Sequence, residues 1–295
     1  MLNLEGKTAV ISGGAEGIGL SLARTFGGLG MNIVLADIEA GPLARAAATL
    51  EKAGIAVCPV EMDVALREDW ERTAAAAAET FGKVHMLVNN AGVGGGMGAI
   101  GNLDESGWRW AIDVNLMGVV YGAEAFVPAM KAHGEDAWVI NVASMAGMAG
   151  VPLAGSYTAT KAAVVALTEA WAAELAETSV RVSVLAPAFV KTRINESHRN
   201  RQARYAPTVM PGPEVMEMAK GASMAVANGI DPDVLSVRVL EALEAGELYI
   251  FTHPKYRSVT DQRYGAVTAA FESAAVSPAV KDVAEVPMSG GFRDT

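Results

Sequence analysis

The sequence has few of the side chains that bind metals or form cross-links. Among 295 residues there is a single cysteine, Cys58, and there are four histidines, His85, His133, His198 and His253. One cysteine cannot form an intramolecular disulfide. The scattered histidines lack the spacing of a metal site. We therefore expect a protein with no disulfide and no metal.

Long apolar runs and an excess of positive charge are also missing. No stretch approaches the roughly eighteen apolar residues of a membrane span. Glu5 and Lys7 interrupt the short apolar run at the N-terminus, which is unlike a secretory signal. The net charge is −10, from 23 basic and 33 acidic residues, and an acidic surface repels nucleic-acid phosphates. We predict a soluble, cytoplasmic protein with no nucleic-acid or membrane partner.

The residues that are present suit a large folded domain. Hydrophobic residues make up 51% of the chain and charged residues 19%, which excludes intrinsic disorder. Short apolar runs alternate with helical patterns, and this order predicts an α/β fold: a parallel sheet with helices on both faces. Strands are expected at 7–12, 32–37, 57–60, 84–89, 137–142, 180–185 and 248–252, and helices at 20–28, 43–53, 67–81, 108–131, 157–177 and 234–245.

The alternation breaks at residues 191–232, which are rich in Arg, Met, Pro and Gly. A tail follows residue 252, with helical spacing from about 258 to 275. There is no internal repeat and no linker between domains. We therefore predict one domain over residues 1–252 and a C-terminal extension over 253–295.

A glycine-rich turn joins the first strand to the first helix. Residues 13–19 have the spacing G-x-x-x-G-x-G. Glycines let the backbone approach a pyrophosphate closely, and the helix N-terminus supplies N–H groups and a positive dipole. Asp37 ends the second strand, where a carboxylate accepts hydrogen bonds from a ribose 2′-OH and repels a 2′-phosphate. Glu16, within the turn, adds negative charge on the same side. The pattern predicts binding of NAD rather than NADP.

A second group of residues indicates acid–base chemistry. Tyr157 and Lys161 are four residues apart and share a face of a predicted helix. A free phenol has a pKa of about 10, and a neighbouring ammonium favours the phenolate. Ser144 follows a predicted strand and could hold a substrate oxygen. Because such residues also occur at this spacing by chance, they leave a non-catalytic reading open.

Together these motifs resemble the short-chain dehydrogenases/reductases, in their order and over roughly residues 5–192. Residues 12–19 match the family's T-G-x-x-x-G-I-G, and residues 89–92 its N-N-A-G. Ser144 and the Y-x-x-x-K of Tyr157 and Lys161 match the catalytic signature. Residues 113–116 match the helix with the catalytic asparagine, Asn115. Asp63 matches the family's acidic residue that contacts the adenine amino group, and residues 187–192 match the family's segment at the nicotinamide.

The resemblance implies a single Rossmann-type domain that oxidises a secondary alcohol or reduces a ketone. Tyr157 would move the alcohol proton, Ser144 would stabilise the carbonyl oxygen, and Lys161 would lower the pKa of Tyr157 and bind the nicotinamide ribose. Asn115 would hold a water that links Lys161 to solvent. The implied NAD contacts are Gly13, Glu16, Gly17, Ile18, Gly19, Asp37, Asp63, Val64, Asn90, Ala91, Gly92, Tyr157, Lys161, Pro187, Val190 and Thr192.

The chain departs from the family at three places. Ser12 replaces a threonine and keeps the hydroxyl, and Ala188 replaces the glycine after Pro187. The usual D-G-G ending is missing, and residues 247–254 with the long tail stand in its place. This ending, together with residues 199–205, is similar to bacterial Cα-dehydrogenases of lignin-derived aryl ethers, which suggests a benzylic alcohol.

The expected substrate region comprises residues 92–101, residues 145–153 and a helical lid at 193–230. The lid holds four methionines, which favour an apolar or aromatic substrate if they line the site; packing within the lid is the alternative. Arg199, Arg201 and Arg204 suggest an acidic substrate or a solvated face. Small residues along the helix from Tyr157, with the family's habit of pairing there, imply a homodimer or homotetramer.

Two other functions compete with this interpretation. A nucleotide-sugar epimerase would use the same cofactor frame, but such relatives usually have G-x-x-G-x-x-G and a longer substrate domain. A redox sensor that binds NAD(H) without catalysis would typically lack the tyrosine or the lysine. The glycine spacing, the N-N-A-G element and the Ser, Tyr and Lys set all favour the dehydrogenase.

Overall fold

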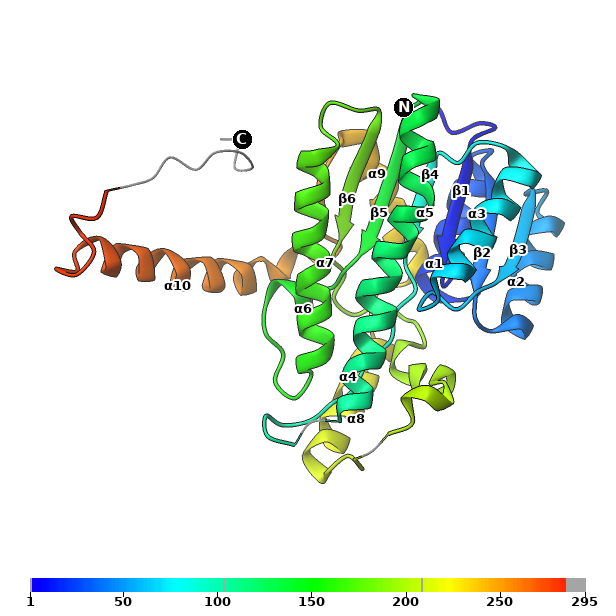
Figure 1. Ribbon diagram of the computed structural model, residues 1–295. Helices are drawn as coiled ribbons and strands as arrows, with labels where there is room; N and C mark the ends of the chain where they lie inside the picture. The colour runs from blue at the N-terminus through cyan, green and yellow to red at the C-terminus, as the bar shows by residue number, and fades with distance from the viewer. Residues whose placement is uncertain (1, 103, 208, 285–295) are drawn as a thin grey trace. The chain divides into compact units, whose positions relative to one another are not determined.

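Figure 1 shows the computed structural model of the chain, which describes residues 2–102, 104–207 and 209–284. The chain divides into two compact units, Met1–Thr252 and His253–Thr295. Each unit is described by itself below.

The first unit is built on a seven-stranded, fully parallel sheet in the order β3-β2-β1-β4-β5-β6-β7. The prediction of a doubly wound parallel sheet is confirmed. The last strand is shorter than expected, because only two of its residues pair with β6. The strands are β1 Thr8–Ser12, β2 Asn32–Asp37, β3 Val57–Glu61, β4 Met86–Asn89, β5 Ala137–Val142, β6 Val180–Leu185 and β7 Tyr249–Ile250.

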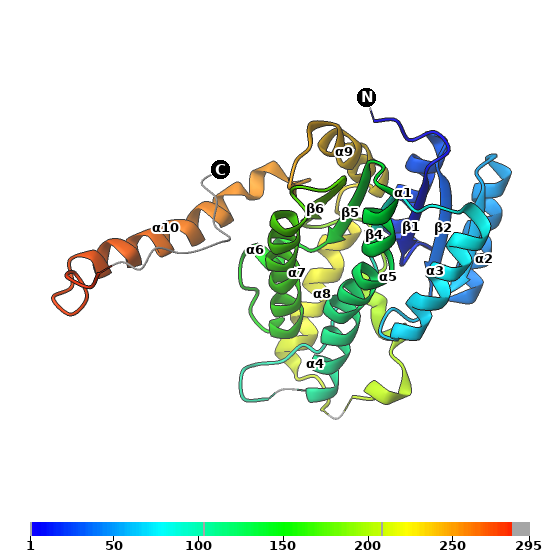
Figure 2. The same cartoon turned by 45° about the horizontal axis from the view of Figure 1, so that its top comes forward.

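Helices cover both faces of this sheet (Figure 2). One hydrophobic core lies beneath α1, α2 and α9, and a second lies beneath α3, α4 and α5, with α7 beside them. The bounds are α1 Gly17–Gly28, α2 Ala40–Lys52, α3 Arg67–Phe81, α4 Glu105–Ile112, α5 Gly118–His133, α6 Met145–Met148, α7 Gly155–Glu174, α8 Pro213–Ala227 and α9 Pro232–Ala245.

The two cores explain why the central strands are continuously apolar. In β1, Val10 pairs with Val34 and faces one core, while Ile11 pairs with Leu35 and faces the other. All four side chains have no solvent exposure. Successive strand residues point to opposite faces, so a strand buried on both faces has no polar alternation. This is why the strand signal in the sequence is clear.

The strand order reverses between β1 and β4, and this reversal positions the site. From β1 the chain moves outward through β2 to β3, and then returns to place β4 on the other side of β1. In such sheets the connections leave a crevice beyond the carboxyl ends of the strands at the reversal. The segments that follow β1, β4, β5 and β6 all meet at this edge.

The helix expected at 108–131 is longer than predicted and interrupted. It comprises α4, a π-helical turn η1 at Asp113–Met117, and α5. The span Glu105–His133 is long and apolar enough to cross a membrane by length and composition, although 50% of the apolar window is buried inside the protein. The expectation that no stretch has this composition therefore needs correction.

The segment between β6 and α9 contains short helices, in line with the predicted lid. These are the 3₁₀-helices η2 Ile194–Asn200 and η3 Ala203–Tyr205, followed by α8. In the second unit, the 3₁₀-helix η4 Pro254–Tyr256 is followed by α10 Arg257–Ala275, where helical spacing was expected. Residues 285–295 of the predicted extension lie outside the described residues. The short helix α6, which follows Ser144, was not predicted.

A buried histidine at the opposite end of the sheet makes stability depend on pH. His85 Nδ1 accepts a hydrogen bond from the Thr8 N–H at 3.2 Å, and Nε2 lies 3.0 Å from Glu135 Oε2. Burial lowers the pKa of His85 below its usual 6.5, although the bond to Glu135 opposes this. Lys83 and His85 hold the pKa of Glu135 at about 2.

We expect the free energy of unfolding to fall as the pH drops through about 6.5, the ordinary pKa of a histidine. Below that pH the unfolded chain protonates His85 while the folded chain resists, and the loss continues until His85 is protonated in the folded chain as well. Urea titrations would measure it. His85→Asn keeps an acceptor for the Thr8 N–H and cannot be protonated. The free energy of unfolding of this variant should therefore depend less on pH. An unchanged dependence in this variant would contradict the assignment.

Candidate functional site

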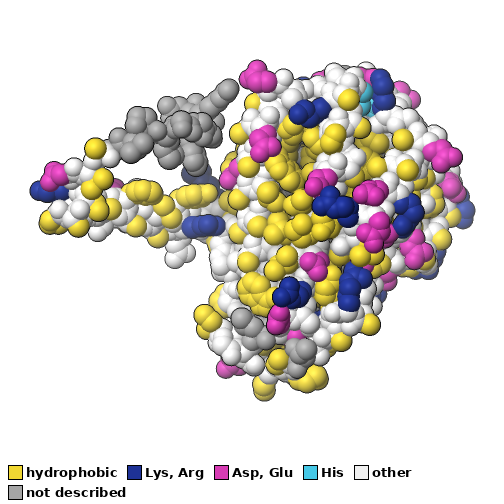
Figure 3. Space-filling view, in the orientation of Figure 1, with side chains coloured by type: hydrophobic (Ala, Val, Ile, Leu, Met, Phe, Trp, Pro, Cys, Tyr) yellow, Lys and Arg dark blue, Asp and Glu magenta, His cyan; other side chains and the backbone are white. Residues whose placement is uncertain are grey.

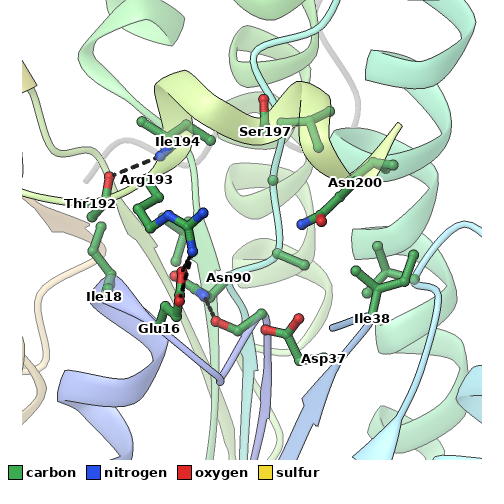
Figure 4. Close-up of a pocket in the computed structure, with 18 of the residues that line it drawn as sticks. Glu16, Ile18, Asp37, Ile38, Asn90, Thr192, Arg193, Ile194, Ser197 and Asn200 are labelled. Atoms are coloured by element: carbon green, nitrogen blue, oxygen red, sulfur yellow. Dashed lines mark hydrogen bonds and ion pairs between the residues drawn. The ribbon is translucent and has the colours of Figure 1, made fainter. Parts of the chain in front are cut away.

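A cavity of about 220 Å³ lies beyond the carboxyl ends of the strands. Figure 4 shows it between the glycine turn and β2 on one side and the segment at 192–200 on the other. Most of the predicted site residues line it, whereas Gly19 and Asn115 lie behind its wall. Its lining includes Gly13, Glu16, Gly17, Ile18, Asp37, Asp63, Val64, Asn90, Ala91, Gly92, Ser144, Tyr157, Lys161, Pro187, Val190 and Thr192.

The glycine turn is a close-packed cradle in which side chains would not fit. Gly13 and Gly17 have φ of 61° and 56°, which L-residues with side chains rarely adopt. A Cβ on Gly13 would lie 2.8 Å from Ala91 Cα, and one on Gly19 would lie 2.3 Å from the Gly13 carbonyl oxygen. The N-cap residue of α1, Glu16, makes no side-chain capping bond. The first N–H groups of α1 therefore have no side-chain cap, and Gly17 and Ile18 of this first turn line the cavity, as an anion site requires.

Ser12 and Asn90 tie this cradle to the neighbouring strand. The Ser12 hydroxyl accepts hydrogen bonds from the N–H groups of Asn90 at 3.0 Å and Ala91 at 3.2 Å. The Asn90 side-chain amide donates to the carbonyl oxygens of Ser12 and Gly13, both at 2.9 Å. The hydroxyl that Ser12 shares with the family's threonine therefore holds the ends of β1 and β4 together. Asn90 shapes the turn through its side chain.

Asp37 ends β2 with its carboxylate at the cavity. Its oxygens accept hydrogen bonds from the N–H groups of Ala15 and Glu39, both at 3.0 Å. Burial raises the pKa of Asp37, and these backbone bonds oppose the rise. The carboxylate oxygens have lone pairs for further hydrogen bonds. The side chain is thus held rigidly where a ribose hydroxyl would meet it.

Glu16 does not add free negative charge, contrary to the expectation from sequence. Its carboxylate forms ion pairs with Arg193 at 3.0 Å and with Arg199 at 3.4 Å, and Figure 4 shows the first of these. The carboxylate of Glu16 therefore lies between two guanidinium groups, which also bind Glu196 and Glu39.

The acid after β3 is also engaged within the chain. Asp63 Oδ1 accepts the Ala65 N–H at 3.0 Å. Asp63 Oδ2 accepts from Gln202 Nε2 at 3.1 Å and pairs with Arg204. Val64, beside it, lines the cavity and accepts the indole N–H of Trp70 through its carbonyl at 3.0 Å. An adenine amino group would have to share Asp63 with these two partners.

The second half of the cavity holds the residues of the acid–base signature. Ser144 follows β5, and its Oγ accepts the Ala146 N–H at 3.1 Å. Tyr157 projects from the first turns of α7. Burial raises the pKa of its phenol, while a hydrogen bond with Ser144 lowers it. Burial outweighs this favourable contact and leaves the pKa of the phenol raised. The predicted lowering of this pKa depends on Lys161 and the nicotinamide ring together and stays a prediction.

Lys161 lies beneath Tyr157 with only 4% of its surface exposed. Its Nζ donates to the Val142 carbonyl oxygen at 2.7 Å and lies 5.8 Å from the centre of the Tyr157 ring. Burial lowers the pKa of Lys161 to about 8. Burial away from water disfavours the charged form of Lys161. Additional oxygen acceptors close to its Nζ would therefore stabilise the ammonium.

Asn115 lies in the π-helical turn η1 and is fully buried. Its Oδ1 accepts the Val93 N–H at 2.8 Å, and its Nδ2 donates to the Val93 carbonyl at 2.9 Å and to Thr160 Oγ1 at 3.3 Å. The side chain thus holds the loop after β4. A π turn inside an α-helix is common at functional sites.

The segment after β6 closes the cavity. The Pro187 carbonyl accepts the Met145 N–H at 2.9 Å, which positions the Ser144 segment. Val190 pairs with Ile230 in an isolated parallel bridge. A Cβ on Gly17 would lie 3.0 Å from Thr192 Cγ2. The glycine turn and Thr192 are therefore in contact, and the predicted nicotinamide segment borders the cradle.

The lid contributes different residues from those expected. Met210, Met216 and Met224 are 83%, 53% and 68% exposed, and the cavity lining from the lid is instead Ile194, Ser197 and Val226, with several polar residues. Arg199, Arg201 and Arg204 form ion pairs with carboxylates of this chain. The expectation of a solvated face is therefore wrong for Arg199 and Arg201, whose side chains are 24% and 14% exposed, but not for Arg204, which is 41% exposed. The acidic substrate stays a prediction. The sequence shows a basic run and several acidic residues, but it does not indicate which acidic residue each arginine pairs with.

Three comparisons with known proteins agree with this geometry. The family model for short chain dehydrogenase matches residues 7–203. The C alpha-dehydrogenase of Sphingobium sp. (strain NBRC 103272 / SYK-6) is 33% identical over 267 residues, which cover 90% of this chain and 87% of that protein. The 3beta-hydroxysteroid dehydrogenase 2 of Eggerthella lenta is 35% identical over 201 residues, covering 68% and 77%.

The solved structure of a short chain dehydrogenase/reductase from Burkholderia phymatum in complex with NAD superimposes with a TM-score of 0.89. It is 37% identical, and the match covers 92% of this chain and 97% of that one. Both the sequence and the fold place the protein in one group, and the chain belongs to the short-chain dehydrogenase/reductase family.

Proposed function

We propose that the protein interconverts a secondary alcohol and a ketone with NAD as the hydride carrier. The observation that supports this best is the arrangement in one cavity of a glycine cradle, the Asp37 carboxylate, and the side chains of Ser144, Tyr157 and Lys161. When bound, the cofactor would take a hydride from the alcohol carbon at its nicotinamide ring. The structural relative in complex with NAD supports the choice of cofactor.

The chain's own residues would manage the proton and the oxygen. Tyr157 would take the hydroxyl proton as the carbonyl forms, and Ser144, bonded to it, would donate a hydrogen bond to the developing carbonyl oxygen. Lys161 would stay charged by binding ribose hydroxyls in addition to Val142. Since burial raises the pKa of Tyr157, the phenolate would need the positive nicotinamide ring close by.

Asn115 would act mainly as a positioning residue. Its side chain is committed to Val93 and Thr160, so a water between Lys161 and solvent would have to bind its backbone carbonyl. Through Val93 it would fix the loop at 92–101, which we assign to the substrate side of the cavity.

The substrate would be apolar or aromatic, and a benzylic alcohol is our first choice. Ala188, Ile194 and Val226 give the region after Pro187 an apolar lining, which replaces the lid methionines as support for this choice. The likeness to a C alpha-dehydrogenase over most of both chains favours a benzylic alcohol over a steroid. The redox sensor and the sugar epimerase remain as alternatives for the experiments below.

We further propose that the protein is a soluble, cytoplasmic homodimer or homotetramer that pairs through α5 and α7. Figure 3 shows apolar side chains gathered over this face of the first unit, with charged residues around them. Tyr121, Ala125 and Trp171 are only partly buried there. The small residues Ala159, Ala162, Ala163 and Ala166 of α7 would allow another helix to approach closely.

Tyr157→Phe should abolish turnover and leave the binding of NADH intact. The change removes one hydroxyl, and a positioned acid–base group contributes about 10²–10⁴-fold to rate. We expect kcat to fall at least about 10³-fold, with an NADH dissociation constant within about threefold of wild type by fluorescence titration. Normal turnover in this variant would contradict the mechanism. Wild-type NADH binding with no turnover on any alcohol would favour the redox sensor.

A panel of alcohols with NAD⁺ should show the substrate class. We expect benzylic secondary alcohols to give the highest kcat/KM, ahead of alicyclic, steroid and sugar alcohols, in assays that follow NADH formation. Activity confined to another class would keep the dehydrogenase and reject the benzylic assignment. Inversion of a nucleotide-sugar hydroxyl without net NADH formation would identify an epimerase.

Asp37→Asn should weaken the preference for NAD⁺ over NADP⁺. The wild type should prefer NAD⁺, because a fixed carboxylate at the ribose repels a 2′-phosphate. Removing the charge should lower the ratio of kcat/KM values by at least about tenfold, or roughly 1.4 kcal/mol. Asp136→Asn is the matched control: this carboxylate pairs with Arg181 at the other end of the sheet, so the ratio should stay unchanged. A wild type that prefers NADP⁺ would refute the role of Asp37.

A further inference from the structure

Residues 193–204, which we call the strap, cross one half of the cavity. The strap comprises Arg193, η2, the residues between the two 3₁₀-helices, and most of η3. It faces the segments after β1, β2 and β3, on the side where Asp37 would place the adenosine of a dinucleotide. Figure 4 shows Ser197 and Asn200 on the strap across from Asp37 and Ile38.

The strap is attached to three carboxylates that follow successive strands. Arg193 and Arg199 bind Glu16 in the glycine turn. Arg199 also binds Glu39, just after β2, at 2.7 Å. Asn200 donates to the same Glu39 oxygen at 3.1 Å. The third carboxylate, Asp63 after β3, binds Gln202 and Arg204. Together these contacts close the side of the cavity near Asp37, where the adenosine would lie.

Two further contacts hold the strap at its inner edge. Arg201 pairs with the buried Asp104 at 2.8 Å, and its guanidinium lies over the Trp110 ring. Ser197 Oγ accepts the Gly94 N–H at 3.0 Å. These contacts fix the strap to the N-terminal end of α4 and to the loop after β4.

Arg199 contributes to the contacts of the strap with both Glu16 and Glu39. Its side chain is 24% exposed, and that of Glu39 is 22% exposed. Burial raises the pKa of Glu39, but bonds from Arg199 and Asn200 outweigh it and hold the pKa below its ordinary value. A pair that is mostly shielded from water interacts more strongly than one on an open surface, yet still responds to salt.

The strap forms one wall of the cavity, and Ile194, Ser197 and Asn200 of the strap line it. The floor of the cavity is the sheet edge and the close-packed glycine turn, neither of which can move without disturbing the core. The strap, held mainly by side-chain ion pairs, is the wall that can shift.

We propose that the strap is an ion-paired gate on the adenosine half of the cofactor site, with the Arg199–Glu39 pair as its latch. The proposal rests on the dinucleotide site proposed above. The cofactor enters and leaves only when the pairs of Arg199 with Glu39 and Glu16 break.

A gate affects the two rate constants of binding in a characteristic way. If the closed strap blocks passage in both directions, loosening it raises the association and the dissociation rate constants together. The equilibrium constant then changes little. If Arg199 merely contacts the cofactor, its loss raises only the dissociation rate constant and weakens binding in proportion.

The test is stopped-flow fluorescence of NADH with wild type, Arg199→Met and Glu39→Gln. We expect both rate constants to rise about tenfold in each variant, with the dissociation constant within about threefold of wild type. Raising NaCl from about 0.05 M to about 0.5 M should speed exchange more in wild type than in either variant. Arg181→Met, which removes an ion pair to Asp136 at the other end of the sheet, is the matched control and should match wild type.

Three outcomes would overturn the gate. Faster dissociation with unchanged association would make Arg199 an ordinary contact, and unchanged rates in both variants would make the strap passive. If wild type binds no NADH at equilibrium, the proposed cofactor site itself fails, and the gate fails with it. Equilibrium titration before the kinetic experiment separates this last result from the other two.

Discussion

The hydrogen bonds at the fork between β1 and β4 are the contacts on which the rest of the site depends. Ser12 and Asn90 exchange bonds across the fork, so the two strand ends cannot separate. The glycine turn leaves one side of this fork and the loop held by Asn115 leaves the other. An anion cradle and an acid–base group are therefore brought to one cavity by the same small set of buried polar contacts.

The two ends of the cavity differ in the charged groups that line them. At the end with Tyr157 and Lys161, burial raises the pKa of the phenol and lowers the pKa of the ammonium, so burial opposes charge on both groups. At the other end, Glu16, Glu39 and Asp63 form ion pairs with Arg193, Arg199 and Arg204.

The sequence predicted the parts of this arrangement that depend on local pattern. Apolar strands, the glycine turn and the spacing of Tyr157 and Lys161 are all short-range signals, and the structure places them as expected. The neutralisation of Glu16 was missed because Arg193 is 177 residues away. Pairing of Glu39 with Arg199 spans 160 residues, and nothing in the composition of a basic segment selects its partners. The raised pKa of Tyr157 was missed for a related reason, since burial is a property of the whole fold.

The single bond from Gly94 to Ser197 has a consequence for how the protein moves. It joins the loop after β4, on the substrate side, to the strap on the cofactor side. Segments linked in this way tend to open as one cooperative unit, whose amide protons exchange with solvent at a common free energy. The two ligands of the protein would then compete for, or share, a single opening equilibrium, and the residence time of one would depend on the presence of the other.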